Sequence, residues 1–128
     1  MQDIRSYLKE NRLLFDGAMG TYLVARTGRP AARCEQANLE RPEEVLAIHR
    51  AYLQAGALAL KTNTFCANRP ALEGDEAGLY RLIDAGWALA ERAAEGNAYV
   101  FADIGPVFTE GAASEYCLVA DRFLERGA

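Results

Sequence analysis

The strongest constraint on the fold is an alternation of short apolar runs and helical segments along the chain. The apolar runs occupy residues 13–15, 57–60 and 99–103. Runs of this length are typical of strands that are covered on both faces, as in parallel sheets. The segments between them carry apolar residues at helical spacing. The alternation therefore predicts βαβ units, and with them an α/β fold with a parallel sheet.

Four helices are expected around these strands. The first is a short leading helix at residues 3–10, and the second begins with proline and two glutamates and spans residues 42–55. A long helix is expected at residues 76–95 and a last one at residues 114–126. Residues 18–39 hold glycines, a proline and polar residues without a sustained period. They predict a long loop with one helical turn at its start.

Two architectures fit this order of elements. A doubly wound sheet fits within a chain of 128 residues. A closed eight-stranded barrel typically needs about 250 residues, so this chain would hold only its first three strands. Length favours the doubly wound sheet, whereas the residues at the strand ends favour the barrel. In both folds the ligand binds at the C-terminal ends of the strands.

Composition and charge exclude several classes of partner. The net charge is −4 and the basic residues are scattered, so no surface suited to nucleic acid is expected. No apolar run approaches the roughly 20 residues that span a bilayer, and the first residues do not form an apolar signal segment. We therefore expect no nucleic-acid partner, no membrane partner and a cytoplasmic location.

Cys34, Cys66 and Cys117 are odd in number and widely spaced, which argues against a disulfide framework. None belongs to a CxxC pair. The sequence therefore predicts reduced thiols that pack as small apolar residues, and no metal site made by this chain alone.

Polar residues follow each predicted strand at its C-terminal end. They include Asp16 after the first strand, Asn63 after the second and Asp103 after the third. Two carboxylates and an amide at neighbouring strand ends could bind a small zwitterion, with the carboxylates holding its ammonium group. The alternative is that each aspartate only caps a turn or the helix that follows. The glycines of this region match neither a dinucleotide-binding motif nor a P-loop.

Two further residues have chemistry that a site could use. Lys61 ends the second apolar run and could form a Schiff base, which suggests a lyase or aldolase. The alternative is a lysine that faces outward or pairs with Asp16 or Asp103. His49 is the only histidine and lies in the middle of a predicted helix, where a surface or boundary position is favoured over a catalytic one.

The motifs and their order resemble the homocysteine S-methyltransferase family. They are Leu14-Phe15-Asp16-Gly17-Ala18-Met19-Gly20-Thr21, Asn38-Leu39 before Pro42, His49 with Tyr52, Gly56 with Thr62-Asn63-Thr64-Phe65 and Ala67-Asn68-Arg69, and Ala102-Asp103-Ile104-Gly105-Pro106. Each is weak alone, but five in the correct order and spacing are specific. The resemblance is greatest to the N-terminal module of bacterial cobalamin-dependent methionine synthases and of fusions of this module with methylenetetrahydrofolate reductase.

The resemblance implies a barrel in which three cysteine thiolates hold a zinc ion that binds the homocysteine sulfur. Zinc keeps that thiol deprotonated at neutral pH, and the thiolate accepts the methyl group. The zinc cysteines of the family come from late strands, and the three cysteines of this chain do not match them. Methylcobalamin or methyltetrahydrofolate, presented by other modules, is the implied methyl source.

The resemblance also implies an amino-acid pocket. Asp16 would hold the homocysteine amine, Gly17 to Met19 would form a close backbone wall, and Asn63 and Thr64 would line the neighbouring strand end. With Asp103 added, the predicted substrate-binding residues are Asp16, Gly17, Ala18, Met19, Asn63, Thr64 and Asp103. Lys61 departs from the family, which usually has glutamate at this position, so a charge beside the pocket is reversed.

The sequence thus predicts that residues 1–128 form about three βα units of a (β/α)8 barrel, ending before the fourth strand. The expected function is that of the N-terminal part of a methyltransferase that makes methionine from homocysteine, inactive alone. Expected partners are homocysteine, the remaining half of the barrel and further modules, with self-association of the isolated chain. The alternatives are a noncatalytic α/β binding domain and the Schiff-base lyase.

Overall fold

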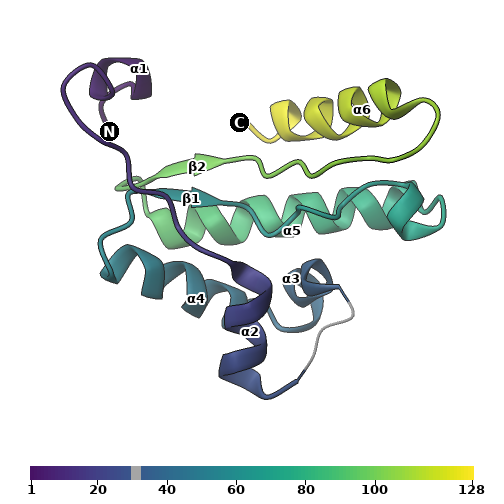
Figure 1. The fold of residues 1–128 in the computed structure, drawn as a ribbon, viewed down its shortest axis with the longest axis horizontal. Helices are drawn as coiled ribbons and strands as arrows, with labels where there is room; N and C mark the ends of the chain where they lie inside the picture. The colour runs from purple at the N-terminus through teal and green to yellow at the C-terminus, as the bar shows by residue number, and fades with distance from the viewer. Residues whose placement is uncertain (30–32) are drawn as a thin grey trace.

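Helices pack around a small parallel sheet in the computed structural model of the protein, which describes residues 1–29 and 33–128 (Figure 1). The elements in chain order are α1 (Ile4–Tyr7), α2 (Met19–Thr27), the 3-10 turn η1 (Cys34–Gln36), α3 (Ala37–Glu40), α4 (Pro42–Gln54), β1 (Ala59–Lys61), the 3-10 turn η2 (Pro70–Leu72), α5 (Glu76–Ala94), β2 (Tyr99–Phe101) and α6 (Ala112–Glu125). The predicted α/β class with a parallel sheet is confirmed.

The helices with a long apolar period are confirmed nearly to the residue. Helix α4 begins at Pro42, where the missing N–H costs no hydrogen bond, and it ends just before Gly56, whose φ is +101°. Helix α5 begins after Asp75, whose side chain accepts the N–H of Gly78 at 2.8 Å. Helix α1 is shorter than predicted, and α6 begins at Ala112, two residues before the predicted start.

The prediction of a loop over residues 18–39 is wrong for most of its length. Residues Met19–Thr27 form the helix α2, and further helical turns lead into α4. Leu23 is the one side chain of α2 that is buried, so the segment shows almost no apolar period to detect. Gly28 ends the helix at φ +66° and donates its N–H to Val24 at 2.8 Å. Residues 30–32 of the predicted loop lie outside the described part of the chain.

The three predicted strands are present as two strands and one bridge in the described residues. Strands β1 and β2 pair in parallel, with Leu60 opposite Val100. The segment at residues 13–15 makes a single parallel bridge, between Phe15 and Ala59. The ladder stops there because the N–H of Lys61 donates to the side chain of Asp16 at 3.0 Å, where a continuing parallel ladder would use the Asp16 carbonyl.

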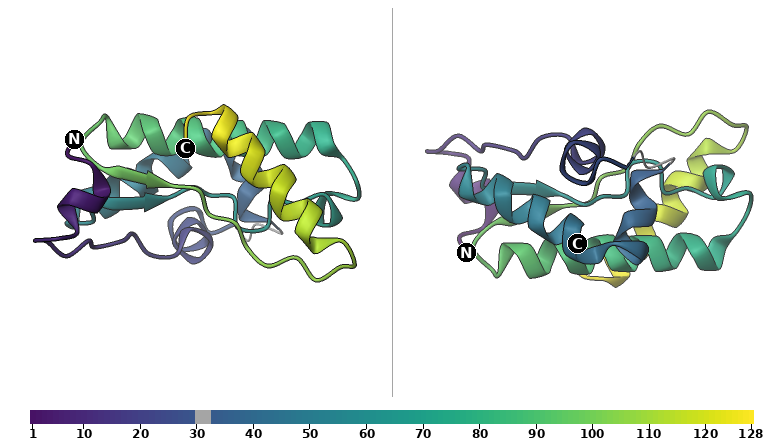
Figure 2. Two further views of the ribbon diagram at one scale, coloured as in Figure 1. Left: turned by 90° about the horizontal axis from the view of Figure 1, so that it is seen from above. Right: turned by 90° about the horizontal axis from the view of Figure 1, so that it is seen from below.

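The two faces of the sheet have different surroundings. Leu60 points to the helices and is fully buried in a core that includes Val45 of α4 and Leu89 of α5. Because side chains alternate along a strand, Ala59 and Lys61 point to the opposite face. There the rings of Phe15 and Phe101 lie 4.8 Å apart, and Phe15 is 43% exposed. Figure 2 shows α5 on one side of the sheet and the N-terminal segment on the other.

A second core lies between α5 and α6. Trp87 packs edge-on against Phe123 at 6.0 Å, and Leu79, Ile83 and Val119 complete the contact. The guanidinium of Arg122 pairs with Asp84 across the same interface. No helix among the described residues is both long and apolar enough to cross a membrane.

Gly86 allows α5 to approach the strand ends closely. A Cβ at this position would lie 2.7 Å from Cγ2 of Thr64 and 2.9 Å from Nδ2 of Asn38. Both neighbours are buried and hydrogen-bonded, so neither can move away freely. The glycine is therefore a packing requirement of the site rather than a helix breaker.

We expect Gly86→Ala to destabilise the fold by about 1–3 kcal/mol, because overpacking outweighs the gain of about 1 kcal/mol in helix propensity. The measurement is urea unfolding followed by circular dichroism. Ala88→Gly is the matched control. Ala88 is exposed on the same helix, so exchanging alanine and glycine there measures helix propensity without a change in packing. A Gly86→Ala variant more stable than the parent would show that the contact is not tight.

Candidate functional site

A cleft of about 680 Å³ opens at the C-terminal ends of the strands. Its walls come from the turn after residue 15, the first turn of α2, the η1 turn and the ends of β1 and β2. All seven predicted substrate-binding residues line it: Asp16, Gly17, Ala18, Met19, Asn63, Thr64 and Asp103. The topology thus brings together residues that are up to 87 positions apart, from 16 to 103. Whether they bind substrate stays a prediction.

Asp16 is a buried carboxylate in the wall of this cleft. Its side chain is 3% exposed, and Oδ2 accepts the N–H of Lys61 at 3.0 Å. Oδ1 is buried and has no hydrogen-bond partner among the described residues. Burial raises the pKa of Asp16 from 3.8 to about 6, although the N–H and the charge of Lys61 oppose the rise. The carboxylate is therefore ionised at neutral pH but lacks a partner for one oxygen.

A hydrogen bond from Tyr52 of α4 holds the backbone that follows Asp16 in the wall of the cleft. The Tyr52 hydroxyl donates to the carbonyl of Ala18 at 2.9 Å. A Cβ on Gly17 would lie 2.7 Å from the same hydroxyl oxygen, so only glycine fits this approach without movement. Met19 then begins α2, whose N-cap residue Ala18 provides no side-chain cap. The first three residues of α2, 19–21, line the cleft, and their N–H groups receive no cap from the side chain of Ala18.

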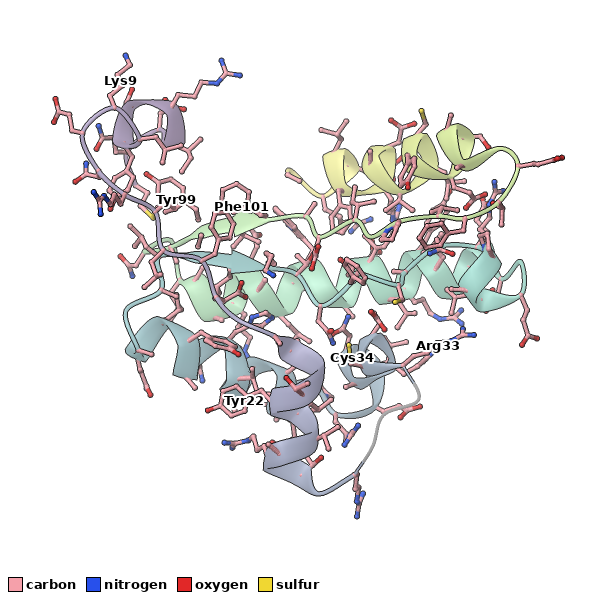
Figure 3. All side chains as sticks on the ribbon, in the orientation of Figure 1. Lys9, Tyr22, Arg33, Cys34, Tyr99 and Phe101 are labelled. Atoms are coloured by element: carbon pink, nitrogen blue, oxygen red, sulfur yellow. The ribbon has the colours of Figure 1, made fainter. Side chains whose placement is uncertain are left out.

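Asn63 uses its side chain to join the neighbouring elements. Its Nδ2 donates to the carbonyl of Cys34 at 2.8 Å and to Oδ1 of Asn38 at 2.9 Å, while its Oδ1 lies 3.1 Å from Sγ of Cys34. Asn38 returns a hydrogen bond to the carbonyl of Asn63 at 2.7 Å. Figure 3 shows Cys34 on the segment that enters α3. Asn63 thus shapes the cleft by holding this segment in place.

Thr64 and Thr62 join β1 to the end of β2 in the same way. The two hydroxyl oxygens lie 2.7 Å apart, Thr64 donates to the carbonyl of Asp103 at 2.8 Å, and the N–H of Asp103 donates to Thr62 at 2.9 Å. Burial raises the pKa of Asp103, with the charge of Lys61 opposing the rise. Asp103 therefore provides a second carboxylate in the lining of the cleft.

For Lys61 one of the two favoured alternatives, direct pairing with an aspartate, is not found, and His49 differs from its favoured interpretation. Lys61 lines the cleft, and its charge lowers the pKa of both Asp16 and Asp103. Among the ion pairs of the described residues none includes its ammonium, so direct pairing with either aspartate is not found. His49 is fully buried, and the prediction of a surface or boundary position is therefore wrong.

Sequence reasoning missed two charged residues of the cleft, Arg33 and Glu35. Both lie in the segment predicted as a loop. Glu35 is 3% exposed, and its Oε1 accepts the N–H of Cys66 at 2.8 Å, which fixes the loop after β1. No motif marked these positions, because their place in the cleft follows from the turn into α3 and not from a local pattern.

The thiols of this chain do not fit the three-cysteine zinc site that the family resemblance implies. Cys34 and Cys66 line the cleft, whereas Cys117 lies on α6 and is not part of its wall. Cys66 and Cys117 are exposed, so the prediction that the thiols pack as small apolar residues is wrong for these two. Within residues 1–29 and 33–128, no group of three or more His, Cys, Asp or Glu side chains is placed to hold a metal ion. Burial raises the pKa of Cys34 to about 12, so its thiol is protonated at neutral pH in the ligand-free protein. We assign no step to a metal held by these residues.

The raised pKa of Asp16 predicts how the stability of the ligand-free protein depends on pH. A carboxyl whose pKa is higher in the folded state destabilises that state when ionised. The loss of folding stability caused by the ionised carboxyl is absent below about pH 4 and complete above about pH 6. We expect Asp16→Asn to raise the free energy of unfolding by about 1–2 kcal/mol at pH 7.5 and to change it little near pH 4. Chemical denaturation at both pH values measures this.

Asp121→Asn is the matched control for that comparison, since Asp121 is exposed on α6 and loses the same charge. We expect it to be neutral at both pH values. A loss of stability in Asp16→Asn at pH 7.5 would contradict the assignment of Asp16 as an unsatisfied buried charge.

Comparison with known proteins places these features in a family. The family model described as homocysteine S-methyltransferase matches residues 13–121. Methionine synthase of Mycobacterium tuberculosis is 34% identical over 140 aligned residues, which cover 96% of this chain and 12% of that protein.

Solved structures of a homocysteine methyltransferase, MmuM from Escherichia coli, have the same fold over most of this chain. The metallated form matches with a TM-score of 0.83 and 26% identity over 98% of this chain and 54% of that one. The apo form matches with a TM-score of 0.77 and 28% identity over 98% and 50%. This chain therefore spans about half the length of these structures and a smaller part of the methionine synthase.

Proposed function

Because this chain belongs to the homocysteine S-methyltransferase family, we propose that its cleft binds the amino-acid part of homocysteine in an enzyme that makes methionine. One observation carries the proposal. Oδ1 of Asp16 is buried in the wall of the cleft and has no hydrogen-bond donor among the described residues. An ammonium group supplies both the missing donor and the missing positive charge. A zwitterionic amino acid brings that group together with a carboxylate.

The two ends of the amino acid have complementary places in the cleft. The ammonium group would bind Asp16, which is ionised at neutral pH because its pKa is about 6. The carboxylate would bind the uncapped N–H groups at the start of α2, where the helix dipole favours negative charge. The tight backbone wall at Gly17 and Ala18 sets the distance between these two places.

Methyl transfer itself requires a nucleophilic sulfur. The homocysteine sulfur forms a new bond to the methyl carbon while the bond between that carbon and its donor breaks, and the thiol releases its proton. The residues described here bind and orient the amino-acid end and provide no group assigned to this step. We propose that the thiol-activating zinc ligands, and the module that presents methylcobalamin or methyltetrahydrofolate, belong to other parts of the enzyme. By itself this chain would not transfer methyl groups.

We also propose that residues 1–128 form about three βα units of an eight-stranded barrel, whose other strands cover the open face of this sheet. The match to about half of each solved homocysteine methyltransferase supports this. So does the apolar face itself, where the tilted rings of Phe15 and Phe101 form a partly exposed pair. Figure 3 shows the Phe101 side chain on β2. Aromatic pairs of this kind are normally covered in a folded domain.

We expect L-homocysteine to bind this protein and Asp16→Asn to weaken binding by about 10- to 100-fold at pH 7.5, the loss expected for one charge-assisted hydrogen bond. Isothermal titration calorimetry under reducing conditions measures both. Asp121→Asn, outside the cleft, is the matched control and should bind like the parent. Equal affinity of parent and Asp16→Asn, or no binding by the parent, would refute the proposed pocket.

The open sheet face predicts concentration-dependent self-association of the isolated chain. Sedimentation velocity at protein concentrations of about 10 µM, which suit weak association, should show dimers or larger species. Phe15→Ser should reduce association, whereas Leu8→Ser, at an exposed site on the leading segment, should not. A parent protein that stays monomeric over the whole range would contradict an uncovered barrel face.

A further inference from the structure

His49 has a position that packing alone does not explain. It is the only histidine of the chain, lies in the middle of α4 and is fully buried. Both ring nitrogens are buried, and neither has a hydrogen-bond partner among the described residues. An imidazole carries at least one N–H, and leaving a buried N–H unpaired costs about 1–3 kcal/mol. An apolar side chain of similar size would avoid this cost.

Asp16 lies close enough to His49 to compensate it after a small movement. Nδ1 of His49 lies 4.0 Å from Oδ2 of Asp16, about 1 Å longer than a hydrogen bond. Asp16 has capacity to accept, since Oδ2 receives one N–H and Oδ1 receives none among the described residues. An unsatisfied buried imidazole therefore lies close to a carboxylate oxygen, Oδ2, that accepts one hydrogen bond and can accept another. A small movement of either side chain joins them.

We propose that His49 is a positioning residue for Asp16. The neutral imidazole, with its proton on Nδ1, donates to the Asp16 carboxylate and keeps it ionised and oriented, so that Oδ1 remains available to a cationic ammonium group in the cleft. The identity of that ligand as an amino acid rests on the proposed function. The contact between His49 and Asp16 does not, because it can be measured without any ligand.

Burial determines which of the two groups is charged. It lowers the pKa of His49 from 6.5 to about 4 and raises the pKa of Asp16 to about 6. At neutral pH the pair is therefore a neutral imidazole beside a carboxylate, and on acidification the carboxylate protonates first. The pair loses its negative charge near pH 6, and with it the attraction for a cation.

Other charged and titratable groups surround His49 and Asp16. The charge of Lys61 on β1 lowers the pKa of Asp16, and Asp103 beyond β2 raises it. Burial raises the pKa of Tyr52, so its phenol stays neutral in this range. Further groups on the packed elements are Tyr22 on α2 and Glu35 in η1. The surface ion pairs of α4 are Glu44 with Arg26 of α2, Glu43 with Arg92 of α5, and Arg50 with Glu95.

Nitrogen NMR of the ligand-free protein tests the contact directly, because a single histidine gives one pair of ring signals. With ¹⁵N-labelled histidine we expect a neutral ring protonated on Nδ1 between about pH 7.5 and about pH 5. The Nδ1 signal should shift as Asp16 titrates near pH 6, and Asp16→Asn should abolish that step. A ring protonated on Nε2, or a Nδ1 signal insensitive to Asp16, overturns the proposal.

Two substitutions of His49 then separate positioning from structural support. Asn places an amide N–H near the position of Nδ1, whereas Leu fills the space without a donor. In His49→Leu the midpoint of homocysteine binding should lie about one pH unit above that of the parent, because the carboxylate has lost a donor to its charged form. His49→Asn should keep the parent midpoint.

The outcomes are distinguishable from failure of the proposed function. A loss of affinity in His49→Leu that is equal at every pH from about 5 to about 7.5 indicates structural support only and overturns the positioning role. If His49→Leu does not fold, the pH midpoint of homocysteine binding by His49→Asn and the NMR titration decide whether His49 positions Asp16. If the parent binds no homocysteine, the proposed pocket fails, while the NMR titration still decides whether His49 holds Asp16.

Discussion

The hydrogen bond from the Lys61 N–H to the Asp16 side chain determines where the sheet ends and the cleft begins. One residue earlier, the N–H of Asp16 still donates to the carbonyl of Ala59 as in a regular parallel ladder. When the carboxylate takes the place of the carbonyl, the backbone at Gly17 is free to turn away and start α2. The same bond holds the carboxylate at the bottom of the opening, so fold and site share one interaction.

Near the hydrogen bond between Lys61 and Asp16, some buried polar side chains have hydrogen-bond partners and others have unpaired atoms. Asn63, Asn38, Thr62 and Thr64 bond to one another and to nearby backbone, so their contribution is rigidity. Asp16 and His49 keep unsatisfied atoms in the described structure. Buried unsatisfied groups lower stability, and they persist where a ligand can compensate them. The difference separates the residues that shape the cleft from those that would act in it.

The sequence predicted elements well where a local pattern matches a buried face. Helices α4 and α5 have long apolar stripes and clear caps, and both were predicted within two residues. Helix α2 buries only Leu23 and was missed. The burial of His49 could not be predicted either, since its position next to Ile48 on α4 is compatible with a boundary site. It becomes buried where α4 packs against α2, α3 and α5, and where Asp16 comes within 4.0 Å of its ring.

By itself the sequence determined the α/β class, the parallel order of the elements and the polar residues at the strand ends, because strand length, helix period and turn residues are local properties. The full set of seven pocket residues was predicted from the resemblance to the family. Only the tertiary structure decided that the side chains of Asn63 and Thr64 form their hydrogen bonds with other residues of the protein. It also decided that Glu35 lines the cleft and that His49 lies 4.0 Å from Asp16. Those relations join residues from separate elements. They arise from burial and from the pairing of polar groups, which depend on what packs against each residue in space and not on its neighbours in the chain.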